Sequence, residues 1–211
     1  MSKTTLPFLC LILFFAFGCT VQDHVLAPLE LKSNKYVIIS NGPNTSNYTL
    51  NFMMLQAKND GQYQGENVSK VRTLLDFDWS QIPSGASIKT AKLSLFFNPL
   101  PNAGGTFLFH EGDNGFSIER ATSAWMPATS SWGSEPSVTS DNRVLIAPST
   151  DSHQDYPDMD VTELVKDMVK TGNMNGFRLK LLAEGNPRFI MWASPNHENP
   201  ALRPKLVITF N

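Results

Sequence analysis

Residues 71–97 have the sequence VRTLLDFDWSQIPSGASIKTAKLSLFF, and the fold class follows from this stretch. The residues that we expect to point into a core stand at every second position. They are Val71, Thr73, Leu75 and Phe77 in the first half and Ala91, Leu93 and Leu95 in the second. A period of two puts successive side chains on opposite faces of a β-strand. A turn signal, Ile82-Pro83-Ser84-Gly85, separates the two series. The stretch therefore predicts two strands, each with one buried face.

The rest of the chain from Tyr36 onward repeats this pattern. Residues 177–182 and 206–210 alternate in the same way, and turn signals at 41–44, 101–105, 112–115 and 196–200 separate the runs. Many short strands of this kind, without helical crossovers, are typical of a β-sandwich. The sequence therefore predicts an all-β fold.

One segment, residues 160–169, follows a helical period instead. Val161, Leu164, Val165, Met168 and Val169 fall on one helical face. Asp160 and Glu163 make a start that resembles a capping box, and Gly172 is a suitable stop. We expect one short helix that covers an open end of the sandwich.

Composition narrows the function classes. Apolar residues make up 41% of the chain and charged residues 17%, which is typical of a folded domain. The 17 basic residues are balanced by 19 acidic ones, so nothing indicates a nucleic-acid partner. The two cysteines, Cys10 and Cys19, lie in the first twenty residues, so the body has neither a disulfide nor cysteine chemistry.

The N-terminal segment has the features of an export signal. Lys3 is followed by an apolar run from Leu6 to Phe17, about 12 residues long, which suits a signal-peptide core better than a membrane span. Residues 16–19, Ala-Phe-Gly-Cys, resemble the lipobox of bacterial lipoproteins, in which the cysteine is acylated. We expect a signal peptide over 1–18, lipid attachment at Cys19, a tether over 19–34 and one domain over 35–211. The alternative is an ordinary cleaved signal with a chance cysteine.

The domain also resembles a known family. The resemblance is carried by residues 74–86 (LLDFDWSQIPSGA), 91–95, the pair Trp125 and Trp132 with Pro136, residues 160–165, 175–177 and 203–210, and the early segment around Tyr36 and Pro43. These pieces are similar, in this order, to the DNRLRE-type domain, which is grouped with carbohydrate-binding module family ninety-six. The resemblance implies a jelly-roll β-sandwich of exported bacterial proteins, often attached to polysaccharide lyases or hydrolases, with alginate-type glycans among the ligands.

Four residues are candidates for glycan contact. Trp125 and Trp132 lie in a Ser/Thr/Pro/Gly-rich loop, where a tryptophan is either a stacking platform or a plug. Arg178 and Lys180 are two positions apart on a predicted strand, so both point away from the core. Such a pair suits the carboxylates of an acidic polysaccharide, and the alternative is an ordinary solvated sheet surface.

Catalytic and metal-binding motifs are not found. The four histidines have no metal-ligand spacing, and a catalytic pair of Asp76 and Asp78 would need a cleft. A lyase would need His110, Tyr156 and Arg188 to meet. We expect no catalytic residue, no metal site and no cofactor. Structural calcium in the oxygen-rich loops 111–115 and 151–160 is the alternative.

Taken together, these patterns predict a lipid-anchored module of the cell envelope, in the outer membrane or at the cell surface, that binds a polysaccharide without catalysis. Two alternatives stay open. One is a structural or adhesion lipoprotein with no sugar ligand, and the other, more distant, is a polysaccharide lyase or hydrolase.

The anchor can be tested directly. Changing Cys19→Ser removes the acyl acceptor, and two or three acyl chains are what hold such a protein stably on a membrane. We expect the variant to leave the membrane fraction and appear in the soluble fraction, measured by immunoblotting after fractionation. Cys10→Ser, in the signal core, is the control and should leave the protein in the membrane. A Cys19→Ser variant that stays membrane-bound would contradict the assignment.

Overall fold

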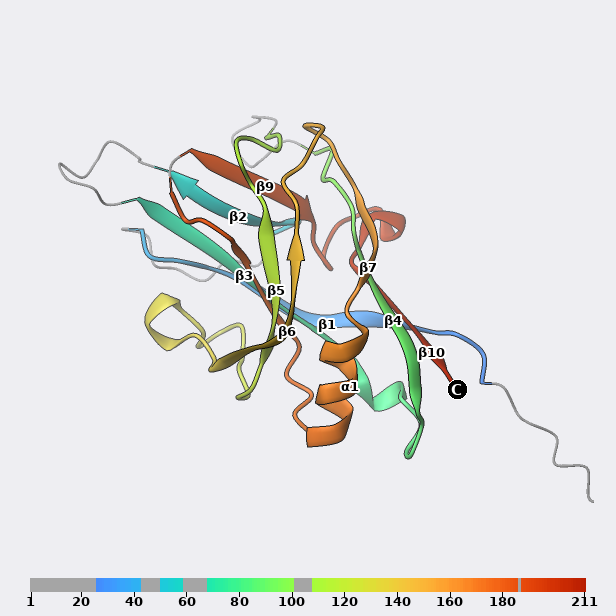
Figure 1. Ribbon diagram of the computed structural model, residues 1–211. Helices are drawn as coiled ribbons and strands as arrows, with labels where there is room; N and C mark the ends of the chain where they lie inside the picture. The colour runs from blue at the N-terminus through green and yellow to red at the C-terminus, as the bar shows by residue number, and fades with distance from the viewer. Residues whose placement is uncertain (1–25, 43–49, 59–67, 101–107, 186) are drawn as a thin grey trace, which may run out of the picture.

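The computed structural model describes residues 26–42, 50–58, 68–100, 108–185 and 187–211 (Figure 1). The expected signal peptide and the expected lipid-attachment residue Cys19 lie outside these residues. The described part contains one α-helix, α1 (Thr162–Thr171), and ten strands: β1 (Leu29–Ser40), β2 (Phe52–Lys58), β3 (Ser69–Phe77), β4 (Ile88–Leu95), β5 (Phe116–Ala121), β6 (Val138–Ile146), β7 (Tyr156–Asp160), β8 (Phe177–Leu181), β9 (Arg188–Ala193) and β10 (Lys205–Phe210). No helix among them is long and apolar enough to span a bilayer.

The strands form two antiparallel sheets that share the long strand β1. Residues 29–32 of β1 pair with β10, which continues through β4 to β7 in what we call the back sheet. Residues 33–40 pair with β3, which continues through β8 and β5 to β6 in the front sheet, and β2 and β9 branch from β3. The register of β1 on β3 shifts between Ser33 and Lys35, where the strand passes from one sheet to the other. This is the expected all-β jelly-roll sandwich.

The core lies between the two sheets and follows the predicted alternation. Leu75 and Phe77 of β3 and Phe177 and Leu179 of β8 meet Leu93 of β4 from the opposite sheet, all with no exposed surface. Trp192 of β9 is also fully buried. Burial of such side chains stabilises by about 1.5–3 kcal/mol each.

Helix α1 closes the end of the sandwich, as expected. It contacts β4 of the back sheet and also β5 and β6 of the front sheet, so it covers the opening between the two (Figure 1). Asp160 accepts a hydrogen bond from the Thr162 amide at the helix start, and Gly172 ends the helix in the left-handed conformation. Hydrogen bonds from Lys92 and Thr162 lower the pKa of Asp160 to about 2, so this carboxylate stays charged at neutral pH.

The expected domain boundary differs from the observed one. The tether was placed over residues 19–34, but β1 begins at Leu29 and its first four residues pair with β10. The alternating sequence Leu29-Glu30-Leu31-Lys32 carries this signal, and Leu31 is fully buried. The helix also runs from Thr162 to Thr171 rather than from 161 to 169.

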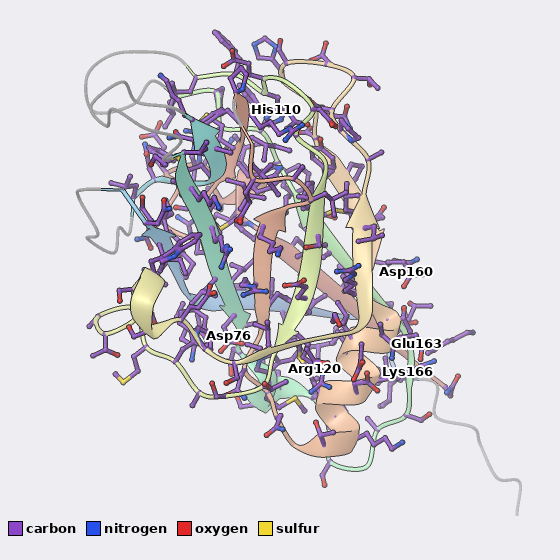
Figure 2. All side chains as sticks on the ribbon, turned by 60° about the vertical axis from the view of Figure 1, so that its left-hand side comes forward. Asp76, His110, Arg120, Asp160, Glu163 and Lys166 are labelled. Atoms are coloured by element: carbon purple, nitrogen blue, oxygen red, sulfur yellow. The ribbon has the colours of Figure 1, made fainter. Side chains whose placement is uncertain are left out.

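Docking of α1 predicts a large effect of truncating its core side chain. Leu164 has no exposed surface, so we expect Leu164→Ala to lower the free energy of unfolding by about 2–5 kcal/mol. Urea denaturation followed by tryptophan fluorescence measures it. The control is Glu163→Ala, which removes only an exposed ion pair with Lys166 (Figure 2) and should cost about 0.5 kcal/mol or less. Equal effects of the two changes would show that the helix is not docked.

Candidate glycan-binding face

The outer side of the front sheet carries a row of charged residues in the middle of three strands. The register places Arg178 of β8 between Leu74 of β3 and Glu119 of β5. Since their neighbours Leu75, Phe177 and Ile118 point into the core, these three side chains point the other way. Arg72 lies two residues before Leu74 and shares its face.

The loop of residues 122–137 folds back over this face and is held by Trp125. The indole is only 5% exposed and packs in a cluster with Val37, Ile39, Leu74 and Ala121. Its Nε1 donates to the Asn175 carbonyl at 2.7 Å. Trp125 is therefore buried between loop and sheet, in the role of a plug.

A close approach of the backbone at Gly176 to β3 brings the Asn175 carbonyl within reach of Trp125. Gly176 has a φ of 70°, and a Cβ there would lie 2.3 Å from the Leu75 carbonyl oxygen. Only glycine fits, so the chain can press against β3 just before β8 begins. The preceding carbonyl, that of Asn175, then faces the Trp125 indole.

Lys35 ties the loop to the sheet from the other side. Its ammonium lies 4.6 Å from the Trp125 ring centroid and donates to the Trp125 carbonyl at 3.1 Å. The same group pairs with the buried Asp76 carboxylate at 3.1 Å (Figure 2). Asp76 also accepts from the Trp79 indole. Asp76 is thus a structural ion-pair partner.

A network of two arginines and three glutamates fixes the far end of the loop. Glu135, from the loop, accepts through one oxygen, Oε1, from Arg72 at 2.7 Å and from Arg178 at 3.0 Å. Arg178 makes two further bonds to Glu119, and Arg72 holds Glu184 through two bonds of 2.8 and 2.9 Å. The five side chains are at most 20% exposed.

The charges of this network stabilise one another. Burial alone would lower the pKa of Arg72, but hydrogen bonds and charge from Glu184 and Glu135 more than offset it and raise the pKa. Burial would likewise raise the pKa of Glu184, whereas Arg72, with help from Lys180, lowers it. The two arginines are thus paired with three glutamates, and Lys180 and Lys70 add positive charge near Glu184.

Trp132 lies on top of this network. Its ring centroid is 4.0 Å from the Arg72 guanidinium carbon, a cation–π contact. Trp132 begins the short 3₁₀ helix η2 (Trp132–Ser134), which mutual hydrogen bonds between Ser131 and Ser134 hold in shape. The ring is half-buried, so a rigidly supported part of it reaches solvent.

The four predicted contact residues therefore have different surroundings. Trp132 lies on Arg72, which Glu135 joins to Arg178. Lys180 lies on the same face, half-buried and with no ion-pair partner within 4.0 Å among the described residues. Trp125 is on the same loop but buried. Arg178 is not a free cation, since two carboxylates bind it. Whether any of the four contacts a sugar stays a prediction.

Sequence reasoning missed Arg72, Glu119, Glu135 and Glu184. The sequence did offer one signal for these ion-pair partners: a charged residue, such as Arg72, in the middle of an alternating strand. The four residues come from β3, β5, the loop and the segment after β8, and a strand pairing is needed to bring them together.

Apart from this face, a hollow of about 240 Å³ lies where β1 meets β10. It is lined by Glu30, Leu31, Lys32, Ser33, Pro195, Pro200, Arg203, Pro204 and Lys205. Lys205 is 3.8 Å from the Glu30 carboxylate, and the Arg203 guanidinium donates to the His197 carbonyl. With three cations and one carboxylate, the hollow is net positive although the chain carries a net charge of −2.

Of the three residues that a lyase would need to bring together, only His110 and Tyr156 lie close to each other. The His110 and Tyr156 rings are 6.1 Å apart, but both side chains are buried, and burial raises the pKa of Tyr156 to about 12. His110 is bonded to the Gln154 carbonyl and to the Met191 amide (Figure 2). Arg188 lies elsewhere, near Asp113 and the Ala183 carbonyl.

The oxygen-rich loops use their side chains for internal hydrogen bonds. Asn114 is bonded to Ser149, Asp151 accepts from the His153 amide, and Asp155 accepts from the Phe97 amide. In the described part of the chain, no three His, Cys, Asp or Glu side chains gather in a metal-binding arrangement.

Comparison with known proteins gives the identity of the domain. No curated protein matches the chain. The family model of carbohydrate-binding module family 96 matches residues 28–210, which is nearly the whole described chain and includes the strand residues 29–34. With the sandwich and the aromatic, ion-paired face described above, this match shows that the chain belongs to carbohydrate-binding module family 96.

Proposed function

We propose that this protein is a lipid-anchored, non-catalytic carbohydrate-binding protein of the cell envelope, and that it holds a polysaccharide on the outer side of its front sheet. The observation that carries the proposal is the partly buried Trp132 side chain, whose ring centroid lies 4.0 Å from the Arg72 guanidinium carbon. Family membership supports the carbohydrate partner.

Trp132 suits a sugar because of what surrounds it. A pyranose packs its C–H face on an aromatic ring and bonds its hydroxyls to fixed polar groups. The Arg72 guanidinium contacts the ring and is bound to Glu184, and the charge of Lys180 acts on Glu184, so donors and acceptors are both at hand. Because the ion pair already holds Arg72 and Glu184 in place, little of their side-chain entropy is lost on binding.

The non-catalytic part of the proposal rests on the state of the titratable groups. All three carboxylates of the network are bound to arginines, and Arg72 lowers the pKa of Glu184 and so holds it charged. A glycosidase needs one carboxylic acid that keeps its proton and a second that is free to act. His110 and Tyr156, the candidate lyase groups, are buried.

Preference for acidic glycans, if the protein has it, is better explained by the hollow at β1 and β10 than by Arg178. Arg178 is neutralised by Glu119 and Glu135. In the hollow, Lys32 is exposed and its charge adds to those of Lys205 and Arg203. The proline walls would contact sugar rings while the cations pair with carboxylates.

The anchor and the location follow from the sequence of the first nineteen residues. A lipidated Cys19 would leave about ten residues before β1 begins at Leu29, a span of at most about 35 Å. The domain would then stand close to the membrane and retain a polysaccharide there for enzymes on other chains.

Removing the Trp132 ring should weaken glycan binding. Stacking on an aromatic ring contributes about 1.5 kcal/mol, so we expect Trp132→Ala to reduce affinity about tenfold and Trp132→Phe to restore part of it. The full-length chain with Cys19→Ser is run in affinity gels containing alginate, pectin or barley β-glucan. Met126→Ala changes a 64% exposed residue of the same loop and is the control. Equal retardation of Trp132→Ala and the control would refute the site, and no retardation of the wild type would favour the structural alternative.

The cationic hollow makes a separate prediction about acidic glycans. A double change of Lys32→Gln and Lys205→Gln should reduce retardation by alginate and pectin several-fold and leave that by β-glucan unchanged, with the difference shrinking at high salt. The control, Lys89→Gln with Lys170→Gln, removes the same charge from exposed residues elsewhere. If both double variants lose the same retardation, the effect comes from net charge and the hollow has no special role.

A further inference from the structure

We propose a second sugar-binding site at the end of the sandwich away from helix α1, formed by Phe97, Phe109 and His153, which we call the aromatic platform. It rests on the proposed function in that its ligand is a carbohydrate, but it shares no residue with the Trp132 face. The platform comes from three separate segments: the chain after β4, the approach to β5 and the connection from β6 to β7.

The three rings pack directly on one another. Phe97 and Phe109 are nearly parallel, with centroids 6.5 Å apart and 8° between planes. The His153 ring meets both edge-on, with its centroid 4.7 Å from that of Phe97 and 5.0 Å from that of Phe109. The buried His110 supports Phe97 from the core side at 5.4 Å.

The backbone below the platform is held by hydrogen bonds on both sides of His153. The His110 amide donates to the Ser152 carbonyl, and the His110 ring is bonded to the Gln154 carbonyl. The Phe97 amide donates to Asp155 at 2.8 Å. A binding surface fixed in this way costs little ordering when a ligand arrives.

The platform is exposed in a way that a core cluster is not. Phe109 is 45% exposed and is the only aromatic among the large apolar side chains that are exposed in the described residues. The His153 side chain is 55% exposed and that of Asp151, 3.7 Å from it, is 71% exposed. Nε2 of His153 has no hydrogen-bond partner in the described part of the chain.

These groups match one face of a pyranose ring. The Phe109 ring offers an apolar surface for the sugar C–H groups. His153 Nε2 and the Asp151 carboxylate offer a ring nitrogen and an acceptor for the hydroxyls at the rim. The net charge here is not positive, so the ligand chemistry that fits is a neutral sugar residue rather than an acidic one.

The position of the platform gives the domain two contact points. Phe109 comes before β5 and the Trp132 loop comes after it, so the two contact points stand on different connections of the front sheet. Figure 2 shows His110, which contacts the platform, at the end of the sandwich away from helix α1. Two weak sites on one domain can raise the affinity for a long chain by about 10²–10⁴ when both engage.

The test is a ¹⁵N NMR titration of the full-length chain carrying Cys19→Ser. The probes are cellohexaose, mannohexaose and an alginate hexasaccharide at millimolar concentration. We expect at least one neutral probe to shift the backbone amides of Phe109 and His153, with the change lost in Phe109→Ala with His153→Ala and restored in part by Phe109→Tyr. Leu145→Ala, which changes another exposed apolar residue, is the control and should shift normally.

The same spectra distinguish binding at the aromatic platform from binding at the front-sheet face. The Trp132 indole reports on the front-sheet face, and the Trp125 indole, bonded to Asn175, is a buried reference. Shifts at Trp132 without shifts at Phe109 and His153 under any probe overturn the platform and leave the proposed face standing. The reverse pattern supports the platform and refutes the face. Shifts at Phe109 that survive in the double variant also overturn the platform.

Discussion

Two arginines on the outer side of the front sheet bind the same oxygen of Glu135, and the shape of the proposed binding face depends on this contact. Arg72 and Arg178 are at most 13% exposed, and a charge that far from water must be paired. Glu119 of β5 neutralises Arg178, and Glu184, from the segment after β8, neutralises Arg72. Glu135 adds a third carboxylate from the loop, so the loop cannot leave without exposing or unpairing charges. Trp132 stays on the guanidinium for the same reason.

Trp125 complements this ion pairing by burial. The cluster it forms with Val37, Ile39 and Leu74 covers outward-facing apolar residues of β1 and β3 that would otherwise meet water. The loop is therefore fastened at one end by apolar contact and at the other by charge. The two tryptophans of one loop have separate tasks: Trp125 fixes the loop, and the loop presents Trp132.

Much of the fold could be predicted from local sequence, because alternation and helical period are local properties. The strands around Leu75, Leu93 and Leu179 and the helix with Leu164 were found in this way. The start of the domain was placed too late because the short Leu29–Lys32 alternation stood beside an irregular tail. A short strand gains its stability from a partner, here β10, and the partner is more than 170 residues away.

The candidate site was less accessible to sequence reasoning. Alternation correctly put Arg178 and Lys180 on the outward face, but charge on a sheet depends on neighbouring strands, and those pairings join β8 to β5 and β3. The local sequence therefore contained no sign that Glu119 and Glu135 bind Arg178, whereas Lys180 has no ion-pair partner within 4.0 Å among the described residues. The burial of Trp125 depends in turn on how the loop folds. The composition of the loop left open whether Trp125 is a stacking platform or a plug.

The distribution of charge over the whole domain leads to a division of ligand chemistry. Near Trp132 the arginines are paired with glutamates, and at the aromatic platform the Asp151 carboxylate lies 3.7 Å from the His153 ring, so stacking would supply most of the affinity at both places. At the hollow between β1 and β10 the balance is positive and the walls are proline. An exposed ion contact contributes about 0.2–1 kcal/mol and weakens with salt. On that basis the aromatic surfaces would decide whether a polysaccharide is held, while Lys32 and Lys205 would decide only whether an acidic chain is favoured over a neutral one.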